Sequence, residues 1–92
     1  MDKYDVLVER IDKLLSILSF IKVTAIADKE FLVKYKEYIK ITRGKAHNRT
    51  LVSSNGVLMG LLRWLSDYSY FDENEELWSI VEDIENYYSK NF

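Results

Sequence analysis

The only histidine of the chain, His47, is the first residue to consider for chemistry. It lies in a basic segment, with Arg43 and Lys45 before it and Arg49 after it. A histidine serves as a general base or activates a nucleophile only when a partner group lies within hydrogen-bonding distance. No local pattern of residues around His47 supplies a nucleophile or a carboxylate. The sequence therefore predicts a protein that is not an enzyme.

Carboxylates, the ligands that hard cations prefer, are concentrated in the last third of the chain. The acidic run that begins at Asp72 does not form an EF-hand loop, because Leu77 stands where such a loop requires glycine. Asp72 and Glu75 have instead the spacing of a helix capping box. The sequence thus predicts no metal site and no cofactor.

A basic stripe in the middle of the chain is the first candidate binding site. Tyr35 and Tyr38 are interleaved with it, and such a mixture can hold phosphates and stack on bases. It indicates an alternative function as a nucleic-acid-associated subunit that binds RNA or single-stranded DNA. The six residues of this basic stripe are Lys34, Lys36, Lys40, Arg43, Lys45 and Arg49.

Aromatic and acidic residues near the C-terminus form the second candidate site. Tryptophan and tyrosine are enriched where proteins bind one another, and acidic neighbours would suit a partner with a basic surface. We expect a non-enzymatic regulator, inhibitor or immunity-type protein that acts through its last helix. The residues predicted to bind the partner are Trp78, Glu82, Glu85, Tyr87 and Tyr88.

Charge is divided unevenly along the chain. Residues 31–65 carry seven basic side chains and one acidic one, residues 66–92 carry one basic and eight acidic, and the whole chain has a net charge of −2. Such segregation is typical of a chain with a charged partner. It arises equally when a basic middle lies against an acidic end within one fold.

Gly56 and Gly60 form a GxxxG pair in the most apolar stretch of the chain. Two glycines inside a helix each cost about 1 kcal/mol relative to alanine, so a closely approaching backbone should compensate. The pair therefore predicts self-association, with a homodimer as one outcome. Alternatively, Asn55 and Gly56 form a turn, and the helix begins only after it.

These residues must be positioned by helices, because apolar side chains recur at spacings of three and four through most of the chain. We expect helices over residues 3–26, 29–43, 46–69 and 73–89, with the third in the centre. Short connections make consecutive helices antiparallel neighbours. The predicted fold is all-α, a small antiparallel up-down four-helix bundle.

One segment also fits another fold. Apolar and polar residues alternate from Tyr38 to Thr42, and β-favouring residues follow Arg49. An α+β fold with a short hairpin near residues 38–53 therefore stays open.

Length and composition limit the remaining possibilities. The 92 residues suit a single helical domain over residues 1–92, and 48% of them are hydrophobic, enough for a modest core. The chain has no cysteine, which excludes disulfides and fits a reducing compartment. No apolar run reaches the length of about 20 residues that a membrane span needs, and no signal peptide is evident. We expect a cytoplasmic protein.

Overall fold

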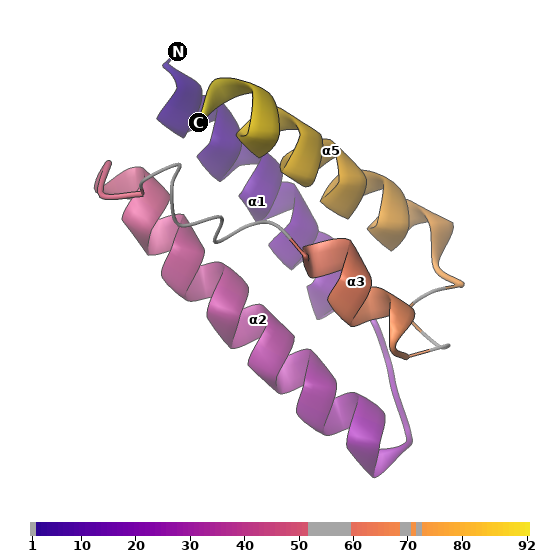
Figure 1. Ribbon diagram of the computed structural model, residues 1–92. Helices are drawn as coiled ribbons and strands as arrows, with labels where there is room; N and C mark the ends of the chain where they lie inside the picture. The colour runs from indigo at the N-terminus through magenta and orange to yellow at the C-terminus, as the bar shows by residue number, and fades with distance from the viewer. Residues whose placement is uncertain (1, 52–59, 69–70, 72) are drawn as a thin grey trace.

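The computed structural model describes residues 2–51, 60–68, 71 and 73–92. Within these residues the helices are α1 (Lys3–Ser19), α2 (Ile26–His47), α3 (Leu61–Ser66) and α5 (Glu75–Asn91), arranged as a small bundle (Figure 1). None of the described residues forms a β-strand. The predicted all-α class is confirmed.

Helix α1 forms as its sequence predicts. The Asp2 side chain accepts a hydrogen bond from the backbone N–H of Asp5 and so caps the first turn. Apolar residues at alternating spacings of four and three form one buried row on the inner face of α1. The helix ends at Ser19, before the predicted residue 26, and the β-branched residues Ile21, Val23 and Thr24, which lower helix propensity, follow it. The buried row consists of Leu7, Ile11, Leu14 and Leu18.

Helix α2 is longer than the predicted 29–43. It continues through Gly44 to His47 because Thr42 and Ala46, both buried, extend its inner face beyond Ile39. Burial of this extra turn offsets the intrinsic cost of glycine in a helix. The helix excludes the alternative hairpin over residues 38–47, and the described residues 48–51 form no strand.

The predicted third helix, 46–69, is not one continuous helix. The prediction is wrong at its start, and it is wrong again at Gly60. Residues 46 and 47 belong to α2, and Arg49 has a φ of 58° in the left-handed region, where no L-residue continues a right-handed helix. Gly60, with a φ of 89°, precedes α3, which spans only Leu61–Ser66. Residues 52–59, including Gly56, lie outside the described residues.

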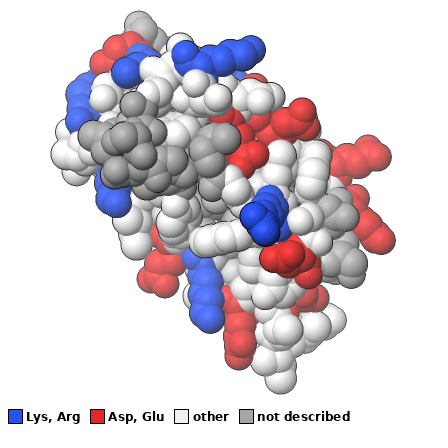
Figure 2. All heavy atoms as spheres, viewed as in Figure 1, with Lys and Arg blue, Asp and Glu red and all other residues white. Residues whose placement is uncertain are grey.

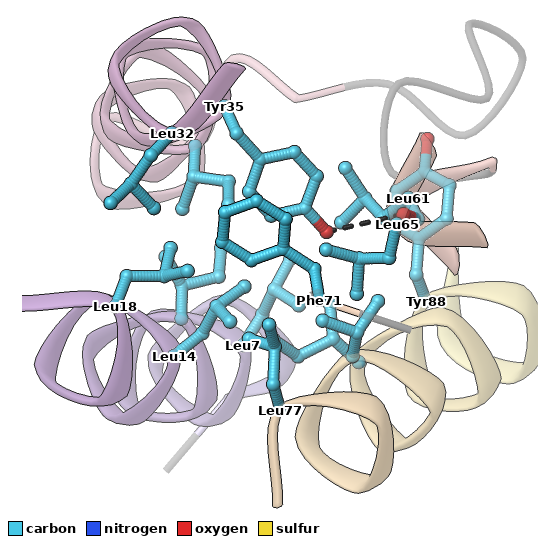
Figure 3. Close-up of a cluster of buried hydrophobic side chains, with 14 of the residues drawn as sticks. Leu7, Leu14, Leu18, Leu32, Tyr35, Leu61, Leu65, Phe71, Leu77 and Tyr88 are labelled. Atoms are coloured by element: carbon cyan, nitrogen blue, oxygen red, sulfur yellow. Dashed lines mark hydrogen bonds between the residues drawn. The ribbon is translucent and has the colours of Figure 1, made fainter. Parts of the chain in front are cut away.

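Helix α1, and not the predicted third helix, is central. It packs against α2 on one side and against α5 on the other (Figure 1). Helix α3 packs against α5 and closes the bundle opposite α1. One cluster of buried side chains draws on all four of these helices and on Phe71 (Figure 3). Consecutive helices run in opposite directions, as the prediction has it (Figure 1). The third of them, α3, has only six residues.

Helix α5 lies close to the predicted 73–89. Asn74 caps it by accepting a hydrogen bond from the backbone N–H of Leu77. The predicted cap, Asp72, lies outside the described residues. Both ends of the chain meet at one end of the bundle, where Lys3 Nζ donates a hydrogen bond to the backbone oxygen of Asn91 at 3.1 Å. No helix in the described parts of the chain is long and apolar enough to cross a membrane.

Candidate functional site

A hollow of about 250 Å³ lies between α2 and α3. Two elements form its walls: α2 supplies three residues, and α3 with the turn after it supplies three more. Four of the six are aromatic, one is basic and one is acidic. The six residues, which we call the aromatic hollow, are Phe31, Lys34, Tyr35, Trp64, Asp67 and Tyr68.

The rings of the aromatic hollow hold one another in place. Residues four apart on a helix share a face, so Phe31 and Tyr35 lie together on α2, with 5.2 Å between their ring centroids. Phe31 stacks on Tyr68 at 4.2 Å, and Tyr35 lies 6.0 Å from Trp64. Each wall therefore touches the other through a pair of rings.

Two hydrogen bonds to one residue, Leu61, fix α3 between α2 and α5. The Tyr35 hydroxyl donates to the Leu61 carbonyl at 3.2 Å (Figure 3). The Leu61 backbone N–H donates to Glu85 Oε1 at 2.9 Å. Leu61 is buried and its N–H is the first of α3, so without Glu85 this donor would lack a partner. The first residue of α3 is thus attached to both long helices that flank it.

Burial also extends the pH range over which the Tyr35 hydroxyl keeps its proton. Its ring is inaccessible to solvent, and desolvation, followed by the nearby Glu85 carboxylate, raises the pKa of the Tyr35 hydroxyl far above its ordinary value of 10.0. The hydroxyl therefore stays protonated and remains a hydrogen-bond donor. Its role in the aromatic hollow is to position α3, because its proton is already committed to Leu61.

The outer side of the aromatic hollow is open. The Trp64 side chain is 42% exposed although it contacts Tyr35 and Tyr38. Lys34 and Asp67, one on each wall, are exposed and form no ion pair with any residue in the described ranges. The aromatic hollow thus presents an apolar floor beside a charge of each sign that no described residue pairs.

The residues predicted to bind a partner through the last helix do not share one surface. Tyr88 is buried at 2% exposure, and the Arg10 guanidinium covers the Tyr87 ring from 5.0 Å. Glu85 is occupied by Leu61. Trp78 and Glu82 remain accessible and line a separate hollow of about 290 Å³ on α5. Trp78, Glu82 and Glu85 recur at spacings of four and three on one face of α5, whereas Tyr87 lies on the opposite face.

The predicted basic stripe is divided by ion pairs within the fold. Arg43 pairs with Asp12 of α1, and Arg49 pairs with Asp2 and Asp5 at its start. These carboxylates raise the pKa of both guanidinium groups, and both arginines contribute to holding the C-terminal part of α2 against α1. Lys36 is partly buried, whereas Lys34, Lys40 and Lys45 are exposed and form no ion pair with the described residues.

His47 is exposed at the last position of α2. Its ring forms no hydrogen bond or ion pair with a residue that the structure describes. Across the same described ranges, no group of three or more histidine, aspartate or glutamate residues is placed to hold a metal ion.

The predicted self-association face does not form as a helix face. Gly60 stands in the left-handed conformation before α3, and no side-chain or neighbouring backbone atom lies within 4 Å of the point where a Cβ would be. Gly56 lies outside the described residues. Among the described residues of the chain itself, none approaches Gly60 closely, and association with a second copy stays a prediction.

The sequence does contain a signal for the aromatic hollow that the predictions above did not use. Phe31 and Tyr35 are four residues apart, and so are Trp64 and Tyr68. Two ring pairs with this spacing on different elements can contact one another. The pairs are far apart in the sequence, so the spacing alone does not predict that they do.

No family model, no curated protein and no solved structure matches this chain. The candidate site therefore rests on the geometry of the described residues alone.

Proposed function

We propose that this protein is a non-enzymatic regulator, inhibitor or immunity-type protein that binds another protein through the aromatic hollow. The single observation behind the proposal is the half-open ring cluster between α2 and α3, with Trp64 42% exposed at its edge. Trp and Tyr are the residues that most often dominate binding energy when they lie in a pocket that a partner desolvates. The proposal therefore makes Trp64 the central contact.

The last helix contributes a second, smaller surface to the proposal. Trp78 and Glu82 lie on α5 one turn apart and remain accessible. Acidic side chains gather over α5 at the right of Figure 2, which suits a partner whose contact surface is basic there. The absence of cysteine agrees with a reducing compartment, and the proposal places the protein in the cytoplasm.

Partner capture with immobilised protein tests the proposal. Trp64→Ala should weaken capture by about thirtyfold, because a central hot spot contributes roughly 2 kcal/mol or more. Proteins retained from the native host by the wild-type chain and by the variant are compared by quantitative mass spectrometry. Circular dichroism of the variant checks that the bundle remains folded.

Val33→Ala is the matched control. Val33 is 62% exposed on the same helix as Phe31 but does not line the aromatic hollow. It should retain every partner that the wild-type chain retains. Equal capture by wild type and Trp64→Ala, or equal losses in both variants, would exclude the aromatic hollow as the contact surface.

A second candidate function is non-specific binding of RNA or single-stranded DNA. The observation in its favour is that Lys40 and Lys45 are exposed on α2 and free of ion pairs with the described residues. The test is a titration of the protein with RNA or single-stranded DNA at increasing salt concentrations. Binding to phosphates releases counterions, so the affinity should fall steeply as salt rises. No binding at low salt would remove this candidate.

A further inference from the structure

The aromatic hollow has a feature that the proposed function does not use, namely two opposite charges on its two walls. Lys34 comes from α2, and Asp67 follows the last turn of α3. They form no ion pair with each other or with any other residue in the described ranges, so the space between them is not closed by their own contact. Both charges are therefore available to a ligand that enters between the walls.

Other charged side chains lie near these two on the same elements. Glu30 and Glu37 are about one helical turn from Lys34, and Arg63 is about one turn before Asp67. None of the three lines the aromatic hollow. Figure 2 shows charges of both signs side by side over α2 and α3, in contrast to the acidic surface over α5.

The size and lining of the aromatic hollow limit what it can hold. Its volume of about 250 Å³ is below the roughly 300–1,000 Å³ of pockets that take drug-sized ligands, so it suits one side chain. Its aromatic lining residues are Phe31, Tyr35, Trp64 and Tyr68, of which Trp64 is the most exposed and Tyr35 has no surface in solvent. Aromatic rings gain most from another ring packed offset or edge-on against them.

We propose that the aromatic hollow accepts one aromatic side chain of a partner protein that is flanked by an acidic and a basic residue. The acidic residue faces Lys34 and the basic residue faces Asp67. This inference rests on the proposed function, because it specifies the chemistry of the partner segment that the aromatic hollow binds. Complementary charges at the rim of a contact select the partner and its orientation more than they add affinity.

Four blocked tripeptides test the inference: Glu-Phe-Lys, Lys-Phe-Lys, Glu-Phe-Glu and the uncharged Gln-Phe-Gln, each acetylated and amidated. Binding is followed in low-salt buffer by the shift of the Trp64 indole N–H resonance, which is identified by its loss in Trp64→Phe. Each correctly placed charge should improve affinity by roughly two- to fivefold, as exposed ion pairs do. Wild type should therefore bind Glu-Phe-Lys best, and added salt should reduce that preference.

Two charge-reversal variants should change the order of preference. In Lys34→Glu both walls are acidic, so Lys-Phe-Lys should bind best. In Asp67→Lys both walls are basic, so Glu-Phe-Glu should bind best. Both residues are exposed, and the full protein spectrum checks that each variant remains folded.

The outcomes separate this inference from the proposed function. If all four peptides bind equally to wild type and to both variants, the charge inference is overturned while the aromatic hollow stands as a site for an aromatic side chain. If no peptide, including Gln-Phe-Gln, shifts the Trp64 resonance up to its solubility limit, the aromatic hollow does not bind aromatic side chains. Both the inference and the proposed contact surface then fail.

Discussion

The junction of α1 with α5 and the junction of α2 with α3 both contain packed rings, but they differ in what else covers the ring faces. Between α1 and α5, cations of the same chain cover the rings: Arg10 lies 5.0 Å from the Tyr87 ring, and Lys3 lies 4.6 Å from the Phe92 ring. Between α2 and α3, the rings cover one another and leave Trp64 partly in solvent. A ring whose face is occupied by a cation has little surface left for a ligand.

The size of a hollow does not distinguish the two junctions. A larger hollow, about 590 Å³, lies between α1 and α5, but Ile17 and Ile80 are the only apolar residues in its lining. Its other five residues are serines or charged side chains, whereas four of the six residues of the aromatic hollow are rings. The two hollows therefore differ in the residue types that line them. We base the choice of the aromatic hollow as candidate contact surface on its lining and not on its volume.

The largest effect is expected when the hydrogen bond that attaches α3 to α5 is removed. Glu85→Ala removes the acceptor of the Leu61 N–H, and an unsatisfied buried amide costs about 1–3 kcal/mol. Hydrogen exchange of amides in α3 should accelerate, while exchange in α1 should change little. Glu82→Ala, an exposed carboxylate of the same helix, is the control and should leave α3 protected. Equal exchange in both variants would mean that Glu85 does not hold α3.

A smaller effect is expected at the other hydrogen bond to Leu61. Tyr35→Phe removes the donor and should lower the free energy of unfolding by about 0.5–1.5 kcal/mol at neutral pH. The measurement is urea unfolding followed by circular dichroism.

The same variant should also change the dependence of stability on pH. Because the pKa of Tyr35 is raised in the folded state, its contribution is fully present below pH 10.0 and is lost as pH rises above that value. The free energy of unfolding should therefore fall more steeply above pH 10.0 in wild type than in Tyr35→Phe. Parallel profiles would contradict the buried, protonated state of the hydroxyl.

The smallest effect is expected at the junction of α1 with α5. Arg10 pairs with Asp83 and lies over Tyr87, but the side chains of the ion pair are 33% and 48% exposed. Arg10→Met keeps the apolar stem and should cost only about 0.2–1 kcal/mol, as partly exposed ion pairs do. Chemical unfolding measures the loss, and the Trp64 indole resonance should not move. A shift of that resonance would show that the two junctions are coupled.

Much of the fold could be predicted because it depends on local spacing. The alternation of three and four along α1 predicts its buried row, and the same spacing predicts the inner face of α5. The third helix was wrong for a related reason. Leu51, Leu61 and Leu65 are all buried and share helical spacing, yet α2 ends at His47, before Leu51, and Gly60 precedes α3. Periodicity alone does not reveal such a break.

The candidate site could be predicted only in part. The sequence predicted partner binding by α5, where Tyr88 is buried and Tyr87 lies under Arg10. Trp78 and Glu82 stay accessible there, and that binding stays a prediction. The aromatic hollow depends on Phe31 meeting Tyr68, which is far from it in the chain. No local pattern specifies which of two distant ring pairs will meet.

The sequence by itself determined that this protein is helical and which side of α1, α2 and α5 faces inward, because the spacing of apolar residues within one helix is a local property. Only the tertiary structure decided which charges pair and which rings stay open. Arg43 pairs with Asp12 across two helices, whereas Lys34 and Asp67 stay unpaired within the described residues beside the exposed Trp64. Those outcomes depend on distances between elements, which packing of the whole chain sets.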